Sequence, residues 1–207
     1  MRLPLAAALG LALLLPACSR TSDYAETTSS VSTMSYAAVP AARTSNVTLV
    51  QITGAGVGGI RAGTAYSSKA IQAALPGFTT DTIQTAEETT TENALGAFNS
   101  DGFQVLQIFR GRDGNVRAVH GVTHHLAGPN GERIGMTFAE AGMRRSDCRV
   151  GQNLWRGMAI CRSKGAPNVE LVFAIPQYQG PWDALPDEGQ LRGAALQRIV
   201  WTPTAQG

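Results

Sequence analysis

The sequence predicts an α+β fold in which two halves, each a helix followed by antiparallel strands, form one compact domain behind a disordered tether. Short β-branched runs bounded by turn residues recur through residues 47–207, which is typical of antiparallel sheets. Two segments with helical spacing of apolar residues, 64–75 and 137–143, each precede a group of these runs. Helix and then strands therefore occur twice, and we expect a single domain over residues 47–207.

The first half begins with a strand and a glycine-rich turn. Residues 47–53 alternate and are β-branched, which predicts a strand. Residues 54–59 then match G-x-G-x-x-G, the pattern of a dinucleotide-binding turn. That fingerprint needs a helix next, whereas residues 60–63 have the pattern of a short strand and turn. We therefore interpret the glycines as a turn between two strand pieces.

The first helix is expected to start at Thr64 and to run to Leu75. Thr64 is a suitable N-cap, and apolar residues from Tyr66 onward share one helical face. Pro76 and Gly77 follow directly and end the helix.

Residues 79–91 are rich in threonine and predict a strand with one exposed face. Glu87 and Glu88 are neighbours within it, and adjacent side chains of a strand point to opposite faces. We therefore interpret them as solvated charges rather than as a paired acid and base.

A β-hairpin is expected in the middle of the chain. Residues 103–109 form a strong strand pattern, and residues 115–122 form its return strand. Asp113-Gly114 between them is a typical hairpin turn. Residues 128–133 then form a loop that leads into the second half.

The second half repeats this order. Thr137 is expected to cap a short helix through Met143. Three further strands are predicted at residues 158–162, 169–175 and 196–202. The segments 60–66 and 134–138, which open the two helices, are alike, as are the closing strands 116–120 and 197–201.

The N-terminus has the pattern of a secretory signal over residues 1–17. Arg2 precedes an apolar run to Leu15 that is too short to span a bilayer as a stable helix. Leu15-Pro16-Ala17-Cys18 resembles the lipobox of bacterial lipoproteins, which implies cleavage after Ala17 and lipidation of Cys18. The alternative is an ordinary signal peptide with a chance cysteine.

The segment 18–46 is rich in Ser, Thr and Ala and has no helical or strand period, so it predicts a flexible tether. Ser19 follows the lipidated cysteine. Similarity to enterobacterial sorting rules implies transfer to the outer membrane, with the domain facing the periplasm; display at the cell surface is the alternative. Removal of residues 1–17 leaves 16 basic and 15 acidic side chains, a formal charge of +1, which argues against a nucleic-acid partner and against a polybasic lipid binder.

Two cysteines remain for the domain. Cys148 and Cys161 form an even pair in an exported protein, which predicts a disulfide. A redox pair or half of a metal site is the alternative, but the sequence contains no Cys-x-x-Cys.

The histidines are the other candidates for chemistry. On a strand, His120 and His124 would share a face, and a carboxylate such as Glu132 would complete a metal site. Their spacing is not that of a zinc motif, and exposed polar residues at a strand end are the favoured interpretation. We expect no cofactor, and the sequence has no G-x-S-x-G, P-loop or HExxH pattern.

The loop 176–189 offers the best candidate contact surface. It carries Tyr178 and Trp182, and aromatic residues are enriched at binding hot spots. The alternative is that Trp182 caps the core while two prolines stiffen the loop. Trp155 and Trp201 are expected in the core.

Residues 55–202 resemble the YfeY-like family of uncharacterised lipoproteins linked to the sigma-E envelope-stress response. The resemblance rests on Gly56-Val57-Gly58, Leu75-Pro76-Gly77, residues 134–138, the Cys148/Cys161 pair, residues 198–201 and Gly180-Pro181-Trp182. It implies an outer-membrane lipoprotein with an α+β domain and assigns no catalytic residues. We therefore expect a non-enzymatic protein that binds an envelope partner, or an envelope-stress accessory protein. An envelope hydrolase or a metal-dependent enzyme with an unrecognised site is the alternative.

Overall fold

The computed structural model describes residues 49–204. The predicted signal peptide, Cys18, the tether and the first two residues of the predicted 47–53 strand lie outside these residues. Their assignments therefore stay predictions.

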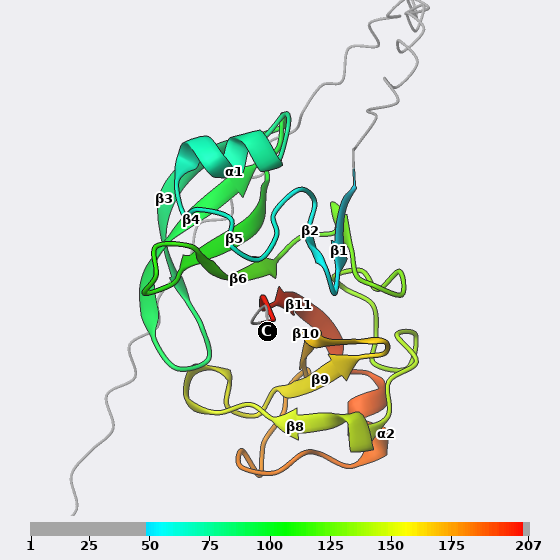
Figure 1. The fold of residues 1–207 in the computed structure, drawn as a ribbon. Coiled ribbons are helices and arrows are strands. Elements are labelled where there is room, and N and C mark those ends of the chain that lie inside the picture. Colours follow the sequence, from blue (N-terminus) through cyan, green and yellow to red (C-terminus); the bar gives the residue numbers. More distant parts are fainter. Residues whose placement is uncertain (1–48, 205–207) are drawn as a thin grey trace, which may run out of the picture. The chain divides into compact units, whose positions relative to one another are not determined.

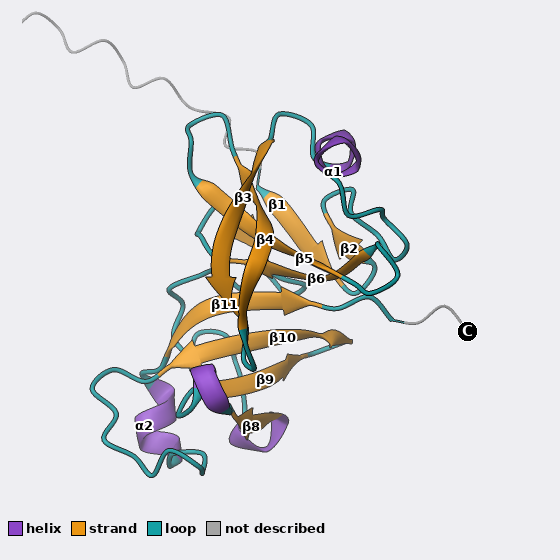
Figure 2. Cartoon of the chain, turned by 90° about the vertical axis from the view of Figure 1, so that its left-hand side faces the viewer, coloured by secondary structure: helices purple, strands orange, loops and turns teal. Residues whose placement is uncertain are grey.

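An eight-stranded antiparallel sheet forms most of the fold, in the order β3-β4-β5-β6-β11-β10-β9-β8 (Figures 1 and 2). Its strands are β3 (Thr79–Ala86), β4 (Thr91–Phe98), β5 (Gln104–Arg110), β6 (Val116–Gly121), β8 (Cys148–Val150), β9 (Ala159–Ser163), β10 (Ala166–Ala174) and β11 (Ala195–Trp201). Strands that follow one another along the chain pair within each of two meanders, β3–β6 and β8–β11. Each meander has four strands, and the two join where β6 pairs with β11.

This junction brings together the two closing strands that look alike in the sequence. His120 pairs with Val200 and Val119 pairs with Trp201 in the β6–β11 ladder. Figure 2 shows the two strands side by side at the middle of the sheet. The described residues thus form one compact domain with two antiparallel parts.

The helices do not follow the predicted pattern of two equivalent halves. Helix α1 (Ser68–Ala74) precedes the first meander, but α2 (Glu188–Arg192) lies between β10 and β11 inside the second. Both helices are short and the fold is mostly β-sheet, so the α+β description overstated the helical part. No helix among the described residues is long and apolar enough to cross a membrane.

Helix α1 starts three residues later than Thr64 suggested. Ser67 is its N-cap, and the hydroxyl of Ser67 accepts a hydrogen bond from the Ala70 amide at 3.2 Å. The Thr64 hydroxyl instead accepts a hydrogen bond from the Arg61 amide at 2.9 Å. Thr64 therefore closes the preceding turn rather than the helix.

The predicted helix from Thr137 to Met143 is wrong: these residues form turns. Thr137 and Glu140 do exchange the reciprocal hydrogen bonds of a capping box. The backbone that follows does not continue as a helix. The Phe138 amide donates a hydrogen bond to the Ala194 carbonyl oxygen, and Gly142 has a φ of +61°. Tertiary contacts and the left-handed Gly142 stop the helix after one turn.

A three-stranded sheet, β2-β1-β7, lies beside the large one. It consists of β1 (Val50–Thr53), β2 (Gly56–Val57) and β7 (Leu126–Ala127), with β1 antiparallel to β2 and parallel to β7. The glycine-rich segment is thus a turn between strands, as expected, and no helix follows it. A Cβ at Gly56 would collide with the Ile60 carbonyl oxygen, which explains a glycine there.

The main hydrophobic core fills one face of the eight-stranded sheet. Ile199 and Trp201 of β11 point into it together with Leu171 and Val169, their partners on β10. Trp201 is buried there, as expected. Because side chains alternate along a strand, Val200 and its partners point to the opposite face of the sheet.

Candidate functional site

The second face of the sheet carries polar residues from several adjacent strands. The ladder pairs Gln107 with His120, His120 with Val200, Val200 with Glu170, and Glu170 with Arg162. Directly paired residues share a face, so these side chains form one row across five strands. Trp155 packs here with Ile160, Val172 and Val200 in a smaller apolar cluster. The prediction that Trp155 is buried is therefore correct.

A β-bulge adds Arg117 to this face. Phe109 pairs with Ala118, but Arg110 pairs with Val116, which leaves Arg117 as the extra residue. Its guanidinium lies over the Phe109 ring, 5.4 Å from the ring centre. It donates hydrogen bonds of 2.9 and 2.7 Å to the two carboxylate oxygens of Glu87 and a third to Glu92.

Glu87 and Glu88, in the turn between β3 and β4, form ion pairs with different parts of the sheet. Glu87 pairs with Arg117 of β6, whereas Glu88 accepts hydrogen bonds of 2.7 and 2.8 Å from Arg149 of β8. The Gln152 amide also donates to Glu88 at 2.8 Å. Their side chains are only 13% and 18% exposed, so their interpretation as solvated charges is wrong. The turn connects the first meander to the second.

The two carboxylates have opposite pKa shifts for physical reasons. Burial raises the pKa of Glu87, although the hydrogen bonds and charge of Arg117 oppose this rise. Burial also acts to raise the pKa of Glu88, but hydrogen bonds from Arg149 and the Gln152 amide outweigh it and lower that pKa.

His120 is the most deeply buried ionisable side chain of this region, with 1% exposure. Its ring contacts Phe109 and Trp155, at centre distances of 4.4 and 5.6 Å. Nε2 lies 3.7 Å from a Glu87 oxygen, too far for a hydrogen bond, and Nδ1 has no partner among the described residues. Burial, with the charges of Arg198 and Arg117, lowers the pKa of His120 to about 3, so the ring is neutral near pH 7.

A cavity of about 380 Å³ lies beside His120. Its wall includes Glu87, Thr89, Arg117, Trp155 and Thr202. Glu88 and Glu170 also line this cavity. Glu87 is held by Arg117 and His120 is a very weak base, so neither of these two is suited to proton transfer near neutral pH. The arrangement holds fixed charges in defined positions.

The other candidate metal ligands lie elsewhere. His124 is exposed after the end of β6 and contacts His125, with ring centres 4.2 Å apart. Glu132 is 3% exposed and accepts hydrogen bonds from Asn130 and Ser163. His120, His124 and Glu132 therefore have different neighbours and do not form the metal site considered from the sequence. Within residues 49–204, no group of three His, Cys, Asp or Glu side chains could hold a metal ion.

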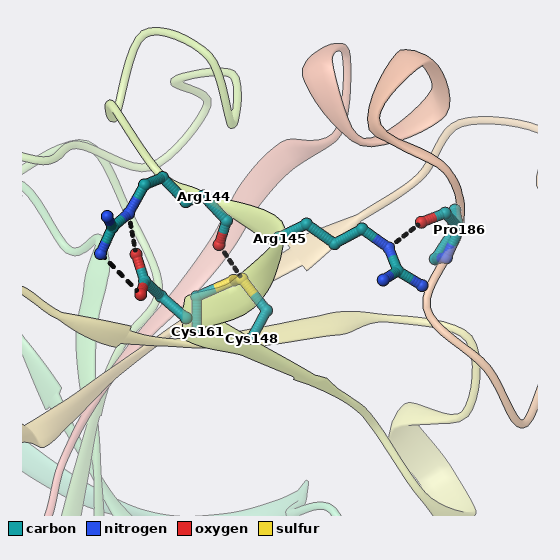
Figure 3. The surroundings of a disulfide bond; sticks show 6 residues. Arg144, Arg145, Cys148, Cys161 and Pro186 are labelled. Atoms are coloured by element: carbon teal, nitrogen blue, oxygen red, sulfur yellow. Dashed lines mark hydrogen bonds and ion pairs between the residues drawn. A yellow bond between two sulfur atoms is a disulfide. The ribbon is translucent and has the colours of Figure 1, made fainter.

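The Cys148–Cys161 disulfide is present and links β8 to β9 at a directly paired position (Figure 3). The S–S distance is 2.06 Å and the Cα atoms are 3.9 Å apart. Figure 3 shows Arg144 and Arg145 pointing to opposite sides of this bond. Arg144 forms an ion pair with Asp147, whereas Arg145 donates to the carbonyl oxygens of Pro186 and Leu185.

Beside the disulfide lies a groove of about 410 Å³, which we call the β8–β9 groove. Its charged lining residues are Arg144, Arg149, Arg162, Lys164, Asp147 and Glu170. Four cations therefore face two carboxylates, which leaves an excess of positive charge. Nothing in the sequence pattern singled out this set, because its members are spread over 27 residues and meet only through the β8–β9–β10 pairing.

The predicted contact surface at Tyr178 and Trp182 is divided between a buried and an exposed residue. Tyr178 is 8% exposed, and its hydroxyl donates to the Pro181 carbonyl oxygen at 2.5 Å. Trp182 is 42% exposed and packs edge-on against the Tyr178 ring. It also covers Gly157, where a Cβ would lie 2.5 Å from the indole. The buried Tyr178 ring therefore packs against the Trp182 indole, and of the two only Trp182 is exposed enough to contact a partner.

A pocket of about 430 Å³ lies next to the indole; we call it the Trp182 pocket. Its polar lining residues are Gln152, Asn153, Arg156 and Asp183. None of these four side chains forms a hydrogen bond or an ion pair within the described part of the chain. Asn153 has a φ of +45°, a conformation that is uncommon outside glycine.

These features define the class of protein: an antiparallel β-sheet domain, braced by a disulfide at one sheet edge, that carries open polar grooves. The chain belongs to the family described as Protein of unknown function (DUF1131), which matches residues 34–203.

The structure is similar to the crystal structure of the uncharacterized protein yfeY from Escherichia coli. The TM-score is 0.57 at 18% sequence identity, over 75% of this chain and 99% of that chain. This similarity shows a shared fold. Together with the family match, it confirms the predicted resemblance to a YfeY-like family of uncharacterised proteins. No match is found among curated proteins.

Proposed function

We propose that this protein is a lipid-anchored binding protein of the bacterial envelope, and not an enzyme. The lipobox-like Leu15-Pro16-Ala17-Cys18 supports the anchor, and Ser19 supports an outer-membrane position with the domain facing the periplasm. Its function in the cell is then to hold or sense an envelope component, as an accessory protein of the envelope-stress response would.

The observation that carries this proposal is the Trp182 pocket. The indole is held from one side by Tyr178 and Gly157, so its exposed part is a rigid apolar platform. The polar side chains around it lack partners within the described residues and are free to pair with a ligand. A sugar ring has an apolar face and a rim of hydroxyl groups, so a glycan of the envelope fits this surface best.

The cavity beside His120 provides the argument against catalysis. Glu87 is fixed by two hydrogen bonds from Arg117 and Glu88 by two from Arg149, while the imidazole of His120 is neutral and has a very low pKa. An envelope hydrolase would need a base with a pKa near the working pH. The rival enzyme hypothesis is tested by activity on peptidoglycan: cleavage that is lost in His120→Gln would establish it.

Binding is tested by co-sedimentation of the full-length chain, purified in a mild detergent, with isolated peptidoglycan sacculi. Trp182→Ala should reduce the bound fraction about fivefold or more, since an exposed aromatic anchor is removed. Phe103→Ala is the matched control, because Phe103 is also an exposed aromatic residue, at 54%. Absence of co-sedimentation, or equal loss in both variants, would overturn the proposal.

The anchor is tested separately with Cys18→Ala. We expect this variant to leave the outer-membrane fraction, either as soluble protein or with an uncleaved signal. If it fractionates with the outer membrane as the parent protein does, Cys18 is not the anchor.

A further inference from the structure

We propose that the β8–β9 groove binds a phosphate group, at a site separate from the Trp182 pocket. Some charged residues of this groove pair with each other, whereas Arg162 and Lys164 form no ion pair within the described residues. The proposed phosphate site does not depend on the glycan ligand proposed above.

The two carboxylates in the groove are already close to cations. Asp147 accepts hydrogen bonds of 3.0 and 3.1 Å from Arg144. Glu170 lies 3.6 Å from Arg149, which is itself held by Glu88. Arg144 and Arg149 are therefore largely committed to carboxylates.

The two remaining cations form no ion pair within the described residues, although the charge of Lys164 helps to lower the pKa of Asp147. Arg162 is exposed, and its guanidinium forms no hydrogen bond or ion pair with another described residue. The Lys164 ammonium donates one hydrogen bond, of 2.8 Å, to the Gly142 carbonyl oxygen. Because an ammonium has three donors, two remain for a ligand. Arg162 lies in β9 and Lys164 in the turn that follows it, and both line the same groove.

The floor of the groove is rigid before any ligand arrives. The Cys148–Cys161 bond links the two strands, and Arg145 holds the turn before β8 to the carbonyl oxygens of Leu185 and Pro186. A site that is ordered in advance loses less conformational entropy on binding.

The donors match a phosphate better than a carboxylate. A guanidinium forms two parallel hydrogen bonds with phosphate oxygens, and a nearby ammonium adds a point charge. A phosphate also neutralises the positive excess of the groove, which is +2 from its lining residues and +1 when Glu88, the ion-pair partner of Arg149, is included. The ligand is thus a phosphate ester or pyrophosphate, as found on phosphorylated sugars and on lipid headgroups.

The test is calorimetric titration of the full-length chain in detergent with inorganic pyrophosphate at low salt. We expect binding that weakens about tenfold or more in Arg162→Gln/Lys164→Gln and falls as salt is added. The control is Arg112→Gln, because Arg112 is an exposed arginine in the turn between β5 and β6 and does not line the groove. This control variant should bind as the parent does.

Two soluble lipids separate the sources of the phosphate. If dihexanoyl phosphatidic acid binds about tenfold more tightly than pyrophosphate, while dihexanoyl phosphatidylcholine does not bind, the ligand is a lipid headgroup. If phosphatidic acid and pyrophosphate bind with equal affinity, the groove recognises the phosphate group alone, and the ligand is not a lipid. No binding of either anion, or equal loss in the Arg112 variant, overturns the proposal. Sacculus binding should be unchanged in the Arg162/Lys164 variant, so the two proposals fail independently.

Discussion

The cavity beside His120 and the β8–β9 groove use the same residue types in opposite ways. In the cavity, Arg117 is held by Glu87 and Glu92. In the groove, Arg162 has no partner within the described residues. Arginines that are paired inside the fold contribute to its stability, whereas unpaired exposed arginines are available to a ligand. The partners of a charged side chain, and not its residue type, therefore indicate its role.

The largest effect we expect is loss of the disulfide, on which the rigidity of the groove depends. Cys148→Ser/Cys161→Ser removes a crosslink between residues 13 apart, which should lower the free energy of unfolding by about 3 kcal/mol. Thermal denaturation should show a melting temperature lower by several degrees, with the sheet still formed. A thiol assay on unfolded, unreduced parent protein should find neither cysteine reactive; two reactive thiols would contradict the bond.

The second prediction concerns pH and the cavity alone. The pKa of His120 is about 3 in the folded protein and about 6.5 when unfolded, so the unfolded chain takes up the proton first. The stabilisation from the neutral ring is complete above pH 6.5 and is lost as pH falls towards 3. By pH 5 the loss should be about 2 kcal/mol.

The matched variant for this prediction is His120→Leu, which is close in volume and cannot take up a proton. Glu87 contributes with the opposite sign, because its raised pKa makes proton uptake easier in the folded state. The difference between parent and variant therefore isolates His120. Urea denaturation from pH 7 to pH 4.5 should show a shallower dependence on pH in the variant. Parallel curves would mean that the fold does not lower the pKa of His120.

The third prediction breaks the cavity's ion pairs. Arg117→Met retains much of the contact with Phe109 but leaves Glu87 and Glu92 facing each other without a cation. Arg117 is 38% exposed, so we expect a moderate loss of about 1–2 kcal/mol, less than for a fully buried pair. The loss should shrink in the triple variant with Glu87→Gln and Glu92→Gln, as measured by chemical denaturation. If the loss of unfolding free energy is the same in the triple variant, the contact of Arg117 with Phe109 stabilises the fold, and its charge does not.

The sequence predicted the strands better than it predicted these pairings. The hairpin of β5 and β6 and the strands β9, β10 and β11 follow from local signals such as Asp113-Gly114 and β-branched runs. The two closing strands are alike in sequence, but their pairing was not predicted. Strand β4 was missed because Ala94-Leu95-Gly96-Ala97 has little β-propensity, although Ala94 and Ala97 are buried. Its Gly96 lies against the Phe98 ring, a contact that no local pattern reveals.

The charged sites depended on features that are not local. The bulge that turns Arg117 outward is visible only once β5 and β6 are paired. The ion pair between Glu88 and Arg149 joins residues that are 61 positions apart in the sequence. In loop 176–189, the predicted contact surface, Trp182 is 42% exposed, whereas Tyr178 is buried and packs against it.

The smallest expected change in stability is that of an Arg162 variant, and it tests directly whether Arg162 differs from the paired Arg117. Arg162→Gln should change the free energy of unfolding by less than about 0.5 kcal/mol, because an exposed side chain without a partner contributes little to stability. Relief of repulsion from Lys164 and Arg149 could even stabilise the fold at low salt, and added salt should remove that gain. Arg117→Met, measured alongside, should remain clearly destabilising. Equal losses in the two variants would show that Arg162 has an internal partner in solution, and the groove would then lack its free cation.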